Sequence, residues 1–290
     1  MELIEVVQAQ KNFILPIGDL VLAPLGDIHY GVEACDTRLL KEYIHRGLEL
    51  QALFLGMGDY IDPIAPSNRA GIDAIRPKLY DSTVDMLDKA ADGAVSELME
   101  LLAPTQGRWI GALKGHHYWT FQDGNTTDCK LADFLGAPFL GDCAALFIDL
   151  VRNGDSKGKH AGKFVIWAAH GHGSAQTDGA IISKLERAAT DFVADIYLMG
   201  HFHRRFGLKK QRINWRREGR QHQMIQQQYV IANTGSYLKG YVPGSKRSGK
   251  PTGTYVEQHL LRPTNLGGLF IHVMPRIRNG YVELTYQIVD

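Results

Sequence analysis

Cysteine is scarce in this chain of 290 residues, which contains only Cys35, Cys129 and Cys143. An odd and scattered set of three indicates neither a disulfide framework nor the paired spacing of a zinc ribbon. The sequence also lacks a transmembrane stretch of about 18 apolar residues, and its first residues do not follow the pattern of a signal peptide. We therefore expect a cytoplasmic protein with reduced, inert thiols and no membrane association.

An excess of charge of one sign is absent as well, because 32 lysines and arginines balance 31 aspartates and glutamates. No low-complexity linker and no internal repeat of domain-forming length divides the chain. We predict a single domain over residues 1–290, with a basic, β-rich excursion at about residues 204–228.

Short apolar runs alternate with segments of helical periodicity, a pattern typical of an α/β layered fold. Buried strands are predicted at residues 21–25, 52–55, 109–113, 164–168 and 196–199. Helices are predicted at residues 39–48, 84–102 and 181–192. From about residue 205 onward the pattern becomes β-rich, with strands predicted at residues 229–232, 269–273 and 281–286.

Aspartate or histidine follows five of these predicted strands, each time beside a glycine. Seven of the 12 histidines belong to these strand ends: His29, His116, His117, His170, His172, His201 and His203. A single histidine at a strand end is usually a hydrogen-bonded surface or core residue. Because ligands of open α/β sheets bind beyond the carboxyl ends of the strands, five such ends together indicate a bound cation.

The residue types indicate which cation this is. Imidazole nitrogens and carboxylate oxygens without thiolates suit Mn²⁺, Zn²⁺, Fe or Ni²⁺ better than Ca²⁺, Mg²⁺ or an iron–sulfur cluster. The predicted ligands are Asp27, His29, Asp59, His116, His170, His201 and His203. Such a set is too large for one tetrahedral ion and suits two divalent ions that share a carboxylate. Asp27 and His29, two apart on an extended chain, face the same side and can bind one ion. A turn could instead divide His201 and His203 between two ions.

The ordered set of motifs resembles the five signature motifs of calcineurin-like metallophosphoesterases. The resemblance covers about residues 19–235 and is carried by Asp27-x-His29, Gly58-Asp59, Gly115-His116-His117, His170 and Gly200-His201-x-His203. It implies a four-layer α/β/β/α sandwich of two mixed sheets. It also implies a phosphoesterase that attacks its substrate with a metal-bridging hydroxide.

The same resemblance assigns a role to each candidate residue. It implies a first metal ion on Asp27, His29 and His203, and a second on His116, His170 and His201, with Asp59 bridging the two. His117 would assist the leaving group as a general acid. Mn²⁺ is the first expectation for both ions, with Zn²⁺, Fe and Ni²⁺ as alternatives.

The third motif departs from the family pattern, which reads Gly-Asn-His followed by an acidic residue. Here His116 replaces the asparagine and Tyr118 replaces the acidic residue. An imidazole at position 116 predicts a site that still binds metal, with a preference for later transition metals. The alternative is that His116 does not ligate and that the second metal is weakly bound or absent. Without the acidic neighbour, the sequence does not show what orients His117.

Two features concern the substrate. His172 either touches the phosphate of the substrate from the end of its strand or is a solvent-facing loop residue. The stretch from Arg204 to Arg220 holds eight basic residues against one acidic residue, and Trp215 interrupts it. This composition favours binding of a nucleic-acid backbone, with Arg204 and Arg205 as the first candidates. The alternative is a solvated hairpin whose cations protect a sheet edge.

We therefore predict a metal-dependent hydrolase of phosphodiester bonds, including a nuclease acting on DNA or RNA as the more specific hypothesis. A phosphomonoesterase or small-molecule phosphatase using the same site is one alternative. A catalytically silent binding scaffold is the other.

Overall fold

The computed structural model describes residues 9–62, 74–152, 160–218, 220–247, 249–258, 260–278 and 281–290. Its helices are α1 (Thr37–Glu49), α3 (Asp81–Leu102), α4 (Thr127–Leu135), α5 (Asp178–Asp191) and α6 (Tyr255–Gln258). Its strands are β1 (Ala9–Pro16), β2 (Leu20–Leu25), β3 (Leu53–Gly56), β4 (Trp109–Ala112), β5 (Cys143–Val151), β6 (His160–Ala169), β7 (Ile196–Met199), β8 (Arg205–Glu218), β9 (Gln221–Thr234), β10 (Lys246–Arg247), β11 (Lys250–Pro251), β12 (Phe270–Arg278) and β13 (Tyr281–Val289). Among the described residues, no helix has the length and apolar character needed to cross a membrane.

Two mixed sheets form the centre of the molecule. One has six strands in the order β1-β5-β6-β7-β9-β8, and the other has five in the order β13-β12-β2-β3-β4. The neighbours β2, β3 and β4 run parallel, as do β6, β7 and β9. The mixed α/β class predicted from the sequence is therefore confirmed.

Hydrophobic residues gather in three clusters that follow the sheets. One cluster joins the two sheets, with Leu22 of β2 and Ile166 of β6 both buried in it. A second holds α1, α3 and α4 against the five-stranded sheet, where Leu40 and Val95 pack with Phe54. The third packs Leu185 of α5 with residues of β6 and β7. Burial of a side chain of this size contributes about 1.5–3 kcal/mol, so each cluster fixes the position of its strands.

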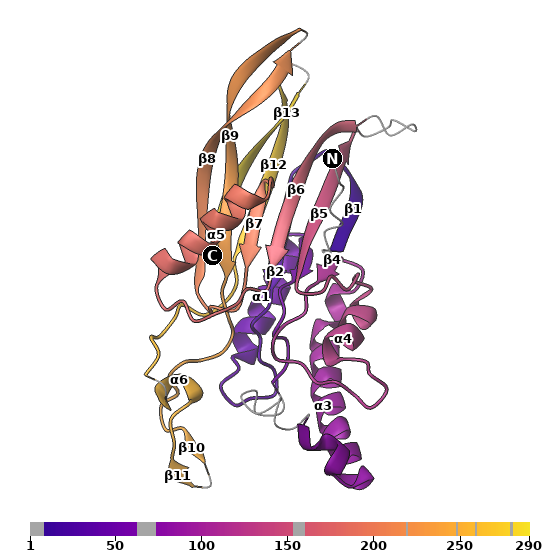
Figure 1. Cartoon of the computed structure of the whole chain (residues 1–290), viewed down its shortest axis with the longest axis vertical. Coiled ribbons are helices and arrows are strands. Elements are labelled where there is room, and N and C mark those ends of the chain that lie inside the picture. Colours follow the sequence, from indigo (N-terminus) through magenta and orange to yellow (C-terminus); the bar gives the residue numbers. More distant parts are fainter. Residues whose placement is uncertain are drawn as a thin grey trace.

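This packing fixes where the strands end. Because β2, β3 and β4 are parallel in one sheet, and β6 and β7 in the other, the loops that follow them lie at corresponding edges. Figure 1 shows the long β8–β9 hairpin extending past the other strands at one end of the molecule, with α3 and α4 toward the opposite end.

Candidate metal centre

Each predicted ligand lies in the segment that directly follows a strand. Asp27 and His29 follow β2, and Asp59 follows β3. His116 follows β4, His170 follows β6, and His201 and His203 follow β7. The buried strands thus deliver side chains from both sheets to one place.

The backbone at these positions is strained. Among the described residues, seven non-glycine residues have a positive φ, and five of them are predicted ligands: Asp27 (47°), His29 (51°), Asp59 (52°), His201 (68°) and His203 (54°). The left-handed region costs a non-glycine residue on the order of 1–3 kcal/mol and is found mostly where function requires it. Strain concentrated in this way is a second, independent sign of a functional site.

Three of the ligands form a first group, Asp27, His29 and His203, whose ligating atoms lie within 4.8 Å of one another. The Nε2 atoms of His29 and His203 are 3.0 Å apart. His203 Nε2 lies 3.4 Å from Asp27 Oδ1. Asp27 is itself held in place, since its carboxylate accepts the backbone N–H of His201 at 2.9 Å.

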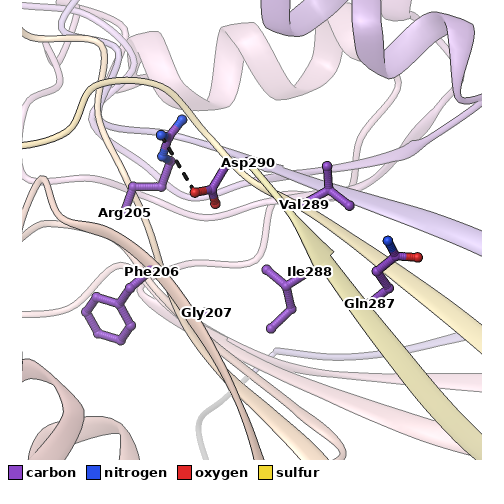
Figure 2. A pocket seen from close by; sticks show the side chains of 7 residues that line it. All are labelled: Arg205, Phe206, Gly207, Gln287, Ile288, Val289 and Asp290. Carbon is purple, nitrogen blue, oxygen red and sulfur yellow. Dashed lines mark ion pairs between the residues drawn. The ribbon is translucent and has the colours of Figure 1, made fainter.

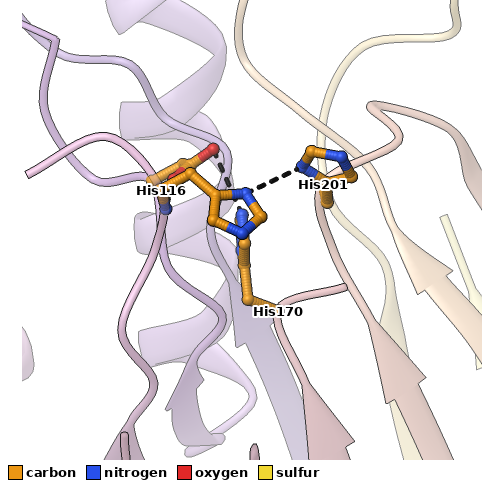
Figure 3. A group of neighbouring side chains, drawn as sticks. His116, His170 and His201 are labelled. Atoms are coloured by element: carbon orange, nitrogen blue, oxygen red, sulfur yellow. Dashed lines mark hydrogen bonds and ion pairs between the residues drawn. The ribbon is translucent and has the colours of Figure 1, made fainter. Parts of the chain in front are cut away.

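The other four ligands, Asp59, His116, His170 and His201, form a second group under the same distance limit. The Nδ1 atoms of His116 and His201 are 3.3 Å apart (Figure 3). His170 Nε2 lies 3.2 Å from Asp59 Oδ2. Position 116 therefore brings an imidazole into the group although the resembled family has an asparagine there.

Asp59 lies between the two groups. Its Oδ2 is 3.2 Å from His170 Nε2 of the second group and 4.0 Å from His29 Nε2 of the first. Its Oδ1 points away from this contact and accepts the backbone N–H groups of His116 and His117. One carboxylate oxygen is thus left facing both groups at once.

Backbone carbonyls fix the tautomers of two histidines. His170 Nδ1 is 2.7 Å from the carbonyl oxygen of Met57, and His201 Nε2 is 2.8 Å from that of Gly173. A carbonyl only accepts, so each of these nitrogens donates its proton outward. The other nitrogen of each ring faces the centre and would be the lone-pair donor once a metal ion is bound, the arrangement that orients metal-binding histidines.

Burial and mutual contact shift the pKa values at the second group in opposite directions. Burial lowers the pKa of His116 to about 4, with His170 adding to the effect. Burial also opposes a charged His170, yet the Asp59 carboxylate raises the pKa of His170 to about 9. One proton on His170 therefore neutralises Asp59 among uncharged imidazoles. A divalent cation would take over this charge and displace the proton.

The residues present fit metal ions. Each ligand group contains a pair of facing imidazole nitrogens, 3.0 Å apart in the first and 3.3 Å apart in the second. The two nitrogens of a pair can share one proton at most, whereas a bound cation can accept the lone pairs of both nitrogens. The two groups together offer five imidazoles and two carboxylates without a thiolate, a donor set suited to divalent transition metals. The cluster is thus a candidate divalent-metal site.

Asp62 belongs to this site and was missed in the sequence. Its Oδ2 lies 3.2 Å from His117 Nδ1 and 3.5 Å from His29 Nδ1. Burial by itself raises the pKa of Asp62, but the contacts with the imidazoles of His117 and His29 outweigh this effect. The net pKa is lowered, so the carboxylate is charged. Asp62 supplies the orienting carboxylate for His117 that is lacking at Tyr118. Its position in the sequence, three residues after the predicted ligand Asp59, could have indicated that Asp62 belongs to the site.

The remaining sequence candidates lie around this centre. His172 is exposed, and its ring centroid lies 5.7 Å from that of His116. Arg204 contacts Asp178 at 3.4 Å and the carbonyl oxygen of Gln176 at 2.9 Å. Arg205 contacts Asp290 at 3.8 Å across a surface pocket between β8 and β13, shown in Figure 2. Both arginine side chains are thus engaged with other parts of the protein.

Several cations of the predicted basic stretch are similarly engaged. Lys210 pairs with Glu186 at 2.7 Å. Arg212 lies 3.8 Å from Asp195 and donates to the carbonyl oxygen of Ala194 at 2.7 Å. The Trp215 side chain, in contrast, is 65% exposed. The net charge of the stretch therefore overstates the number of cations that face solvent unpaired.

No protein-family model matches the chain, and no curated protein matches it. Among the solved structures that are similar in fold, three cover more than nine-tenths of this chain. The first is a conserved uncharacterized protein of Streptococcus pneumoniae, a predicted phosphoesterase, with 13% identity, 93% of this chain and 99% of that chain covered, and a TM-score of 0.34. The second is Vacuolar Protein Sorting 29 of Cryptosporidium parvum, with 13% identity, 94% and 99% covered, and a TM-score of 0.30. The third is the wild-type protein of the same name from Entamoeba histolytica, complexed with zinc, with 11% identity, 93% and 100% covered, and a TM-score of 0.29.

At 11–13% identity these matches show a likeness of fold.

Proposed function

We propose that this protein is a metal-dependent phosphoesterase that hydrolyses phosphodiester bonds at a dinuclear centre. The observation that carries the proposal is the position of Asp59, whose Oδ2 faces His170 of one ligand group and His29 of the other. A shared carboxylate between two ligand groups is the arrangement of a two-metal site. The proposal includes the four-layer α/β/β/α arrangement implied by the motifs, which the three hydrophobic clusters support.

Two divalent ions bound there would lower the pKa of a bound water toward neutrality and offset the charge that develops on the phosphate. The chain's own residues do the rest. Asp59 holds the two ligand groups beside each other through its Oδ2. Its Oδ1 fixes the loop that carries His116 and His117 by accepting their backbone N–H groups. His117 is 23% exposed and gives its proton to the departing oxygen. The carboxylate of Asp62 fixes the ring of His117 for that transfer.

The donor set bears on which metal is used. Five imidazoles against two carboxylates form a nitrogen-rich site, which favours later transition metals over Mg²⁺ or Ca²⁺. We keep Mn²⁺ as the first metal to test, with Zn²⁺, Fe and Ni²⁺ as the comparison.

A nuclease is the more specific version of the proposal, and the β8–β9 hairpin is the observation that favours it. The exposed residues Lys209, Trp215 and Arg217 occupy odd-numbered positions on one face of β8. At about 3.4 Å per residue, Trp215 lies roughly 40 Å along the chain from His203. A small ester bound at the centre does not reach that far, but a single strand of several nucleotides does. An aromatic and cationic surface at this distance suits a polymeric phosphodiester.

The proposal is tested with metal-stripped protein, Mn²⁺ added back, and a small bis-aryl phosphodiester as substrate. We expect Mn²⁺-dependent hydrolysis in the wild type and a loss of at least about a hundredfold in His117→Ala, within the range for a general acid. An equal rate in both proteins would remove His117 from the mechanism. No hydrolysis with any of the four metals would leave the silent scaffold as the better account.

The nuclease version has its own test. Trp215→Ala combined with Lys209→Glu should reduce cleavage of single-stranded DNA or RNA without changing hydrolysis of the small diester. A wild type that hydrolyses the small diester but cleaves no polymer, or polymer cleavage that is unaltered in this variant, would contradict the nuclease version and leave the phosphoesterase intact.

A further inference from the structure

The loop that connects β4 to α4 carries His116 and His117 and is held by two carboxylates. Gly115 N–H donates to Asp128 Oδ2 at 2.9 Å. The next two backbone N–H groups, those of His116 and His117, donate to Asp59 Oδ1. Three consecutive N–H groups are therefore bound by Asp128 and Asp59.

Asp128 holds a fixed position at the start of α4. Its side chain is 1% exposed and lies in the first turn of α4. A negative charge is favoured there by the helix dipole. The turn itself is rigid, because Thr126 caps the helix by accepting the N–H of Cys129 at 3.1 Å. The carboxylate that binds Gly115 thus stands on a fixed element.

The same turn of α4 also binds the loop on the other side of the two histidines. Thr127 Oγ1 accepts the N–H of Trp119 at 3.0 Å, and Thr127 N–H donates to the carbonyl oxygen of Trp119 at 3.0 Å. The His116–His117 pair is therefore clamped at both of its ends by neighbouring residues of one helical turn.

The backbone at Gly115 packs closely against Asp59. A Cβ atom at this position would lie 2.0 Å from the backbone nitrogen of Asp59. The loop backbone therefore rests directly on the residue that faces both ligand groups. Any displacement of Gly115 moves the two histidines relative to Asp59.

We propose that Asp128 is a positioning residue that sets His116 as a ligand of the second group and His117 as the proton donor. Asp62 lies against the ring of His117, whereas Asp128 acts from α4 through the backbone of Gly115. This inference rests on the proposed function, and it adds a residue that touches neither substrate nor metal.

Three variants test it, with Asp133→Ala as the matched control because Asp133 is an exposed carboxylate on the same helix. Asp128→Ala removes the acceptor. Asp128→Glu keeps a carboxyl group but displaces the acceptor by one methylene, and serves if the alanine variant does not fold. Asp128→Asn keeps an acceptor of the same shape and should restore most of what the other two lose.

The first readout is binding of Mn²⁺, followed without turnover by titration calorimetry. We expect the affinity of the second ion to fall about 10- to 100-fold in Asp128→Ala and Asp128→Glu, the range for residues that orient a ligand from behind. Hydrogen exchange of the Gly115 amide should accelerate in the same variants of the metal-free protein. Unchanged affinity and exchange would overturn the proposal.

The second readout separates positioning from a general loss of structure. At saturating Mn²⁺, kcat is compared for a diester that releases nitrophenolate and one that releases phenolate, which is more basic and needs a proton more. A displaced His117 should lower kcat about tenfold more for the phenyl ester. Equal losses on both esters would show that Asp128 is merely structural. A wild type that binds no metal and hydrolyses neither ester would instead refute the proposed function itself.

Discussion

Replacing Asp62 with alanine perturbs both halves of the centre through one atom. Asp62 Oδ2 lies 3.2 Å from His117 Nδ1 and 3.5 Å from His29 Nδ1. His29 is 2% exposed, so solvent does not replace the lost carboxylate at its ring. The substitution should therefore affect a metal ligand and the proton donor together.

The size of the effect follows from these contacts. A buried polar group left without its partner costs about 1–3 kcal/mol, and about 1.4 kcal/mol corresponds to a tenfold change. The affinity of the first metal ion, on Asp27, His29 and His203, should fall about 5- to 150-fold. Loss of the partner of His117 should lower kcat by about 10- to 100-fold at saturating metal.

The assay is a double-mutant cycle with His117→Ala, measured as Mn²⁺ affinity and as kcat on the bis-aryl diester. Because Asp62 acts on kcat through His117, Asp62→Ala should lower kcat far less in the His117→Ala background. Asp81→Ala, which removes an exposed carboxylate at the start of α3, is the control and should change neither quantity. Additive losses in kcat would show that Asp62 does not act through His117, and unchanged metal affinity in Asp62→Ala would show that it does not support His29.

Three further predictions follow from individual residues. His116→Asn exchanges an imidazole for a neutral oxygen ligand and should raise the preference for Mn²⁺ over Zn²⁺ in a competition titration; an unchanged preference would show that His116 does not ligate. Arg212→Ala should lower the free energy of unfolding by about 1–3 kcal/mol in urea, because it leaves the carbonyl of Ala194 and the buried Asp195 without their cation. The exposed Lys209→Ala should stay within about 0.5 kcal/mol of wild type, and equal effects of the two substitutions would contradict this difference. Cys35 should not react with a thiol reagent at pH 8 in the folded protein, since burial raises its pKa to about 11; peptide mapping that finds Cys35 labelled as fast as in urea would be the contrary result.

The apolar strands that deliver the site could be predicted from the sequence. The predicted strand at residues 196–199 is β7, and the predicted helix at residues 84–102 lies within α3. Such runs are legible because fully buried strands are continuously apolar and amphipathic helices are periodic. β5 (Cys143–Val151) was missed: it alternates between buried and half-buried positions and carries Asp149 among its apolar residues. The short helix α4 was missed as well, although Thr126 and Gly136 are its capping residues.

The candidate ligands could be proposed from their order along the chain, but the contacts that orient them could not. Asp62 touches His117, which lies 55 residues further on, and only the packing of β3 beside β4 brings them together. The role of Asp128 likewise depends on where α4 places its first turn. For the basic stretch, a count of charges suggested more unpaired cations than the structure has. Lys210 pairs with Glu186, and Arg212 lies beside Asp195.

A titration of metal-stripped protein with Mn²⁺ shows whether the phosphoesterase centre holds two ions that share Asp59. Bound metal per chain and hydrolysis of the bis-aryl diester are measured at each step, for wild type and for Asp59→Asn. We expect two ions per wild-type chain, with activity that rises as the second ion binds. In Asp59→Asn, binding of the second ion and the activity should both be lost. A single ion per chain at full activity, or hydrolysis that is independent of metal, would exclude a shared two-ion centre.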